Sequence, residues 1–160
     1  MDHFLDKLSS YNLFNYLLPG VLFAVLVGKV TPYHFLQSDI LIGVFVYYFI
    51  GLVISRAGSL FIEPFLKKLK FLKFAPYSEF VIASKKDEKI ELFSESNNMY
   101  RTLCAMCGLL FVLRFYRLIE VRYFLQGYGI YVLSVALLLM FLFAYRKQTN
   151  YITKRIKANL

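Results

Sequence analysis

The chain has 160 residues, is 59% hydrophobic and carries a net charge of +9. Soluble domains average about 45–50% apolar residues, and the excess here falls into blocks long enough to cross a bilayer. The charges flank these blocks, as membrane topology requires, so we do not expect nucleic-acid binding. We expect an all-α integral membrane bundle of four transmembrane helices, forming a single domain over residues 1–160.

The first apolar block predicts the first membrane span. Residues 2–11 have the apolar spacing of a short interfacial N-terminal helix. Span one follows at 12–30, and Pro19 predicts a kink or a helix start there, because proline donates no backbone hydrogen bond. Asn12 and Asn15 precede it, and we expect them in the headgroup region or bonded to a neighbouring helix.

A turn rich in Pro, Ser and Asp leads to span two, at 40–62, which we expect to end before Pro64. Residues 63–99 form the long cytoplasmic segment between spans two and three. In it, Ser84-x-x-Asp87 has the pattern of a capping box that opens a helix. The segment starts with basic residues that we expect to bind lipid head groups at the interface, namely Lys67, Lys68, Lys70 and Lys73.

The last two spans are predicted at 100–119 and 128–145, followed by a basic cytoplasmic tail at 146–160. The cytoplasmic helix is expected either to end before span three or to run directly into it. The Asn97-Asn98 pair is the weak point of the continuous alternative, because asparagine is a poor helix former.

The lysines and arginines predict the orientation. Fourteen of them fall in the N-terminal segment, in 63–101 and in the tail. The opposite side has Lys29, Arg122 and Arg117. By the positive-inside rule we expect both termini and the 63–99 segment on the cytoplasmic side.

Small residues recur along one face of span two at Gly43, Gly51, Ser55 and Ser59, with Gly58 beside them. Small residues at four-residue spacing let two helices approach closely. This face is expected to pack against the other spans of the same chain, to join copies in a homo-oligomer, or to do both.

One arginine lies inside an apolar span. Arg56 is about six residues from the cytoplasmic end of span two, where a charge in hydrocarbon costs a few kcal/mol. Glu63 is seven residues further and lies on the same helix face, so an ion pair is feasible. Arg56 is therefore expected to snorkel to the interface, to line a polar region or to contact another subunit.

A second group of charges lies at the far end of span three. Arg114, Arg117 and Glu120 follow each other at three-residue spacing and share one face. We expect an ordinary salt-bridged helix end at the outer interface. The alternative is a basic collar around a pore mouth or an anionic lipid site.

No catalytic motif is visible, and we predict that the chain is not an enzyme. Cys104 and Cys107 are the only cysteines, and with the two histidines distant in sequence they do not make up a zinc site. We expect them to act as small packing residues. No metal and no cofactor is expected.

Three segments carry a resemblance to known proteins: YNLFNYLLPGVLF at 11–23, SRAGSLFIEPFLKK at 55–68 and SNNMYRTL at 96–103. They resemble small multi-pass membrane proteins of unassigned function in bacterial genomes, some of them beside antiphage-defence genes. The resemblance implies a membrane effector or a membrane-anchored sensor. No catalytic residues carry over from it to this chain.

Together these features predict a small oligomeric inner-membrane protein. It would contact the lipid bilayer, copies of itself and a cytoplasmic protein partner or signal, and it would open or depolarise the membrane. The alternative is a small-solute channel or transporter subunit, which would need polar residues converging at mid-membrane.

Overall fold

The computed structural model describes residues 12–122 and 128–158, in which every regular element is a helix. The predicted interfacial helix at 2–11 lies outside the described residues. Four continuous helical stretches are long and apolar enough to cross a membrane, as predicted. In chain order the elements are η1 (Leu13–Leu17), α3 (Leu18–Val30), α4 (Ile40–Ala57), η2 (Gly58–Ile62), α5 (Glu63–Lys68), α6 (Tyr77–Lys86), α7 (Lys89–Arg122) and α8 (Gly129–Lys157).

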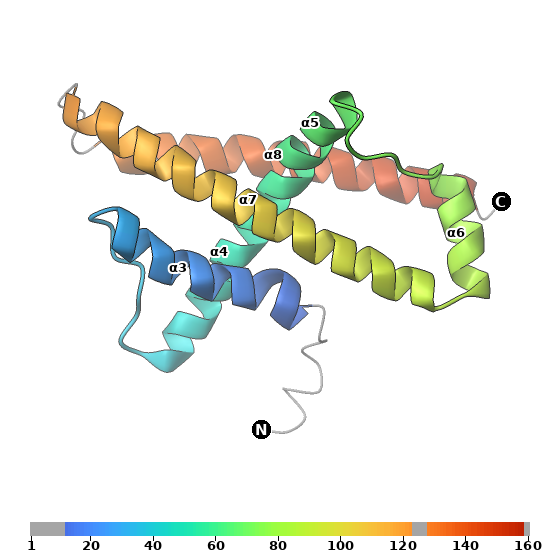
Figure 1. Cartoon of the computed structure of the whole chain (residues 1–160), viewed down its shortest axis with the longest axis horizontal. Coiled ribbons are helices and arrows are strands. Elements are labelled where there is room, and N and C mark those ends of the chain that lie inside the picture. The colour runs from blue at the N-terminus through green and yellow to red at the C-terminus, as the bar shows by residue number, and fades with distance from the viewer. Residues whose placement is uncertain (1–11, 123–127, 159–160) are drawn as a thin grey trace.

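The long helices alternate in direction along the chain, and α4 crosses the others obliquely (Figure 1). Helices α7 and α8 run antiparallel, and α6 contacts both of them beside the N-terminal end of α7 and the C-terminal end of α8. The rings of Tyr77 in α6 and Tyr151 in α8, tilted by 46° with their centroids 5.8 Å apart, are part of this contact. We call this end of the molecule, formed by α6, the first three turns of α7 and the last three turns of α8, the platform.

The two prolines within the first two spans are accommodated by π-helical turns. Each turn begins six residues before its proline: η1 before Pro19 and η2 before Pro64. A proline ring clashes with the carbonyl four residues earlier, and a widened turn relieves this clash while the chain stays helical. The disturbance predicted at Pro19 is confirmed. The expectation that Pro64 ends span two is wrong, because the helix continues to Lys68.

The basic stretch after span two is not one interfacial segment. Helix α5 ends in a Schellman motif, in which Phe71 N–H donates to the Leu66 carbonyl and Lys70 N–H to the Lys67 carbonyl, each at 3.0 Å. Lys70 has a φ of 58°, a left-handed conformation that favours glycine. The chain therefore turns sharply there and leads back to α6.

Helix α7 is one unbroken helix, so the helix predicted ahead of span three does run directly into that span. Its 34 residues extend about 51 Å at 1.5 Å per residue, well beyond a hydrocarbon core of about 30 Å. The predicted capping box is wrong. Ser84 lies inside α6, and it is the Asp87 carboxylate that caps α7 by accepting from Lys89 N–H at 3.0 Å.

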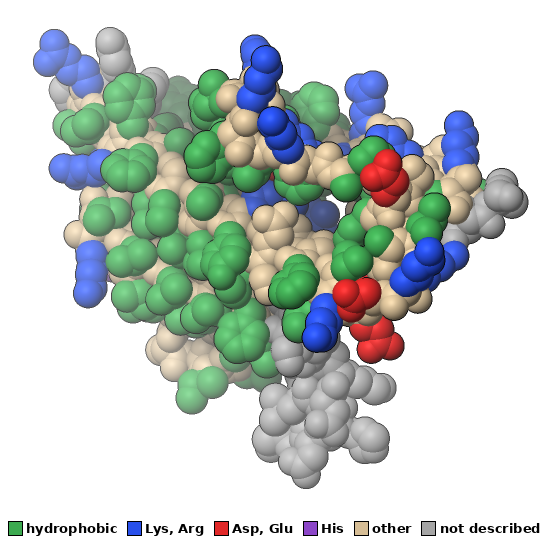
Figure 2. Space-filling model, turned by 45° about the vertical axis from the view of Figure 1, so that its right-hand side comes forward, with side chains coloured by type: hydrophobic (Ala, Val, Ile, Leu, Met, Phe, Trp, Pro, Cys, Tyr) green, Lys and Arg blue, Asp and Glu red, His purple; other side chains and the backbone are tan. Residues whose placement is uncertain are grey.

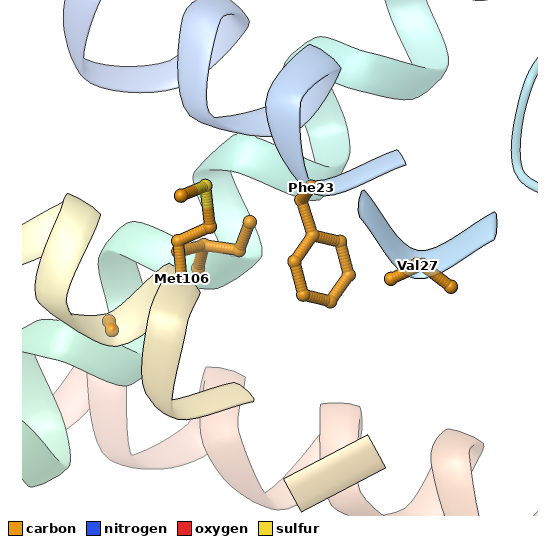
Figure 3. Close-up of a cluster of buried hydrophobic side chains, with 5 residues drawn as sticks. Phe23, Val27 and Met106 are labelled. Carbon is orange, nitrogen blue, oxygen red and sulfur yellow. The ribbon is translucent and has the colours of Figure 1, made fainter. Parts of the chain in front are cut away.

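The centre of the bundle is filled by apolar side chains from three helices. Phe23 lies between Val27 and Met106 (Figure 3), and Ile54 and Ala105 complete the cluster. Large apolar side chains cover the outside instead, and Figure 2 shows them as a broad belt with basic groups near its edges. A surface of this kind is expected for helices in contact with lipid.

The first two spans pack with their backbones in contact. A Cβ on Gly20 would overlap the Tyr47 carbonyl, and a Cβ on Gly51 would overlap the Tyr16 carbonyl. Only glycine fits at such a crossing. The small-residue face of span two is therefore used within the chain, which is one of the two roles expected for it.

Gly51→Ala should destabilise the bundle by at least about 1–3 kcal/mol, because the new methyl group forces the backbones of spans one and two apart. Gly108→Ala is the matched control, since its Cβ would meet nothing nearer than Ile62 Cδ1 at 4.0 Å. Thermal unfolding of the purified variants in detergent measures the difference. Equal stability of the two variants would contradict the close crossing.

Candidate functional site

A single carboxylate joins three segments of the chain at the platform end of the bundle. Glu63, at the start of α5, is only 7% exposed. It accepts hydrogen bonds from Lys67 on its own helix and from Arg101 of α7, both at 2.8 Å. The ammonium of Lys147 in α8 lies 3.7 Å away. We call these four residues the Glu63 cluster.

Each basic partner of Glu63 is placed by its own helix. Lys67 reaches Glu63 because residues four apart are neighbours on a helix, and its ammonium also lies 4.2 Å from the centre of the Phe74 ring. Lys147 donates to both the carbonyl and the hydroxyl of Ser59, at 2.6 and 2.8 Å. Through Lys147, helix α8 is therefore bound to both η2 and α5.

The Glu63 cluster bears on two expectations. Glu63 does not pair with Arg56: the π-helical turn η2 lies between them, so their seven-residue spacing does not align them as it would in an α-helix. The carboxylate is paired instead with Lys67, Arg101 and Lys147. The basic residues expected to bind lipid heads, Lys67, Lys68, Lys70 and Lys73, are all exposed, and Lys67 also pairs with Glu63. Their binding to lipid heads stays a prediction.

A buried polar trio lies next to the Glu63 cluster. The Thr102 hydroxyl lies 2.8 Å from the Asn98 carbonyl, 3.0 Å from Asn15 Oδ1 and 3.2 Å from Ser55 Oγ. The trio of Asn15, Ser55 and Thr102 thus joins η1, α4 and α7, and each member is at most 4% exposed. Of the two places expected for Asn15, the bond to a neighbouring helix is the one observed.

The rest of the small-residue face also packs within the chain. A Cβ on Gly58 would lie 3.1 Å from that of Ala105 and 3.2 Å from the Arg101 carbonyl, and Gly43 lies against the ring of Tyr47. Gly58 thus brings span two close enough to α7 for Arg101 to reach Glu63.

Arg56 lies in a small pocket between the end of span two and α8. It is partly buried and makes no hydrogen bond or ion pair with any residue in the described ranges. The pocket is lined by Arg56, Ser59, Leu60, Ala144, Lys147, Gln148 and Tyr151. No carboxylate lines it, so the positive charge of Arg56 is not neutralised there by the described part of the chain.

The second charged group, at the opposite end of α7, has the arrangement of a salt-bridged helix end. Glu120 accepts from Arg117 and from the Tyr33 hydroxyl, both at 2.7 Å. Burial and the hydrogen bond to Glu120 raise the pKa of Tyr33 to about 12, so its hydroxyl stays a donor at neutral pH. Arg114 stands apart and donates to the Val30 carbonyl at 3.4 Å.

The two cysteines do not pack in the interior, so that expectation is wrong. Cys104 and Cys107 are free and exposed on α7, and the residues between them, Ala105 and Met106, are the buried ones. Among the described residues no group of three or more His, Cys, Asp or Glu side chains is placed to hold a metal ion.

The sequence singled out Glu63 and Asn15 but not the partners of Glu63, Arg101 and Lys147, nor the partner of Asn15, Thr102. One sequence feature could have pointed to these partners: polar and charged residues at the ends of apolar segments need bonding partners when they are buried. Comparison with known proteins adds no further assignment: no family model, curated protein or solved structure matches the chain.

Glu63→Gln should cost about 3–5 kcal/mol, because it leaves Arg101 and Lys147 partly buried without a counter-charge. The matched control is Glu79→Gln on α6, an exposed carboxylate whose loss should change stability by no more than about 0.5 kcal/mol. Denaturant unfolding in mixed micelles compares the two. A similar loss for both variants would show that the Glu63 cluster contributes little.

Proposed function

We propose that the chain is a membrane effector or sensor subunit of the bacterial inner membrane, with the platform in the cytoplasm. A soluble partner or signal would bind the platform, and the bundle would respond by opening or depolarising the membrane. The resemblance to proteins found beside antiphage-defence genes suggests such a system as its setting.

The distribution of charge supports this orientation. The platform end carries the basic residues of α5, of the α5–α6 connection, of α6 and of the end of α8, whereas the opposite end has few. Because cytoplasmic segments are enriched in lysine and arginine, the platform is assigned to the cytoplasm.

The observation that carries the proposal is the continuity of α7 and α8 from the platform into the apolar belt. Both helices are unbroken there, and both are tied to Glu63 near the point where they leave the belt. Helices move as rigid elements, so a displacement at the platform would reach the bundle directly. This is the arrangement expected of a subunit that converts cytoplasmic binding into a membrane response.

We also propose that the chain forms a homo-oligomer, but through a surface other than the small-residue face of span two. Gly51, Ser55 and Gly58 are already buried against the chain's own helices. Helix α8 is a better surface for a homo-oligomer, because Met140 is the only residue buried along its described length.

The alternative, a small-solute channel or transporter subunit, has less support. The middle of the described bundle is filled by apolar side chains. The polar trio does converge, but Thr102 directly follows Arg101, which places the trio at the platform end and not at mid-membrane.

The test is induced expression in the native host with a membrane-potential dye. Wild type should depolarise the membrane. Asn97→Pro should not, because a proline inside α7 costs about 3 kcal/mol and interrupts the helix between platform and bundle. Asn97→Ala is the matched control and should behave as wild type.

Depolarisation by Asn97→Pro at wild-type membrane levels would contradict the coupling. Absence of depolarisation by the wild type would contradict the effector role. The sensor role would then be tested by co-purification, in which deletion of α6 should release the cytoplasmic partner. Retention of the partner by that deletion variant would contradict the sensor role as well.

A further inference from the structure

The contact between η2 and α8 leaves two pockets that share Leu60 and Lys147. The first contains Arg56, described above. The second is wide and open and is walled by Leu60, Phe61 and Phe143, with Arg146, Lys147 and Asn150 at its polar end. We propose that this pair of pockets binds one anionic membrane phospholipid, with its phosphate near Arg56 and an acyl chain along the aromatic wall.

The charge around the two pockets favours an anionic ligand. Four basic residues, Arg56, Lys67, Arg101 and Lys147, lie around this end of span two, and Glu63 is the one acidic residue among them, which leaves a net charge of +3. Lys67 and Arg101 already donate to Glu63. Lys147 also lies 3.7 Å from Glu63. One carboxylate cannot balance all four cations, and Arg56, which lines a pocket together with Lys147, has no acidic partner among the described residues.

The position of Arg56 favours a phosphate group as the ligand. It lies within the apolar helix α4, where an unpaired cation is costly, and its pocket is lined by further hydrogen-bonding groups from Ser59, Gln148 and Tyr151. A phosphate group offers several acceptor oxygens to such a set of donors and matches the planar guanidinium.

The apolar wall of the second pocket favours a lipid over a soluble anion. Phe61 and Phe143 are 62% and 55% exposed, and they belong to the apolar belt that faces the bilayer. An acyl chain can occupy that wall without leaving the hydrocarbon, while the head group reaches the basic residues. Basic pockets between transmembrane helices on the cytoplasmic side are known to hold anionic lipid heads.

This site is separate from the exposed lysines Lys68, Lys70 and Lys73, which would attract any anionic surface. The inference requires that the bundle lies in a bilayer. It does not depend on the proposed coupling between platform and membrane, because binding is measured on the purified protein.

The experiment titrates the purified full-length protein in neutral detergent, at physiological ionic strength, with phosphatidylglycerol, phosphatidylcholine or inorganic phosphate. Bound lipid is counted by native mass spectrometry, and salt suppresses the exposed lysines more than a buried site. Wild type should retain one phosphatidylglycerol in preference to phosphatidylcholine. Arg56→Gln should weaken this binding roughly tenfold or more, through loss of a charge-assisted hydrogen bond.

Lys154→Gln is the matched control, because it removes the same charge from α8 at an exposed position outside both pockets, and binding should stay within about twofold. Tyr151→Phe serves if Arg56→Gln does not fold: it keeps the ring beside Tyr77, removes one donor and should weaken binding severalfold. Unchanged binding by these two pocket variants would overturn the proposal. So would equal retention of phosphatidylcholine, or displacement of the lipid by inorganic phosphate.

Discussion

The ion pairs of the Glu63 carboxylate are the interaction on which the arrangement of the platform end depends. Glu63 is the only described acidic side chain within reach of Arg101 and Lys147, and it links α5, α7 and α8 in one place. In surroundings with little water such attractions are stronger than at an aqueous surface, and a cation left alone is costly. The platform is thereby attached to the bundle at a defined point.

Two ion clusters mark the ends of the apolar part of α7. Arg101 pairs with Glu63 at one end, and Arg117 pairs with Glu120 at the other. Sixteen residues separate the two arginines, which is about 24 Å along a helix, close to the thickness of a hydrocarbon core. Charged pairs at this spacing position the helix across a bilayer. The same spacing explains why α7 must extend beyond the membrane on the platform side.

The four spans could be predicted from the sequence because apolar length and flanking charge are local signals. The close approach of span two was also predictable, since Gly51 and Ser55 repeat at helical spacing. Its partner was not: whether a small face meets a span of the same chain or another copy depends on helix crossing angles, and these follow from contacts far apart in sequence. Gly20 supplies half of that crossing, whereas the sequence yielded an inference only for its neighbour Pro19.

The candidate site was predictable in part for the same reason. Glu63 and Arg56 attracted attention as charges near an apolar span, and their shared helix face suggested that they pair. Local spacing alone gives no information on Arg101 and Lys147, which reach Glu63 from 38 and 84 residues away in sequence. The expectation that Pro64 ends span two was wrong for a related reason. The proline is visible in the sequence, but the π-helical turn that accommodates it within a continuous helix has no comparably clear signal.

The central claim is that the platform and the α3–α4 connection lie on opposite sides of a membrane, with the platform in the cytoplasm. Single cysteines at Ser38 and Glu88, both exposed, test it in a chain whose Cys104 and Cys107 are replaced by serine. A membrane-impermeant maleimide should label the Ser38 position in spheroplasts and the Glu88 position only after lysis. Labelling of the Glu88 position in intact spheroplasts, or of both positions alike, would contradict the account.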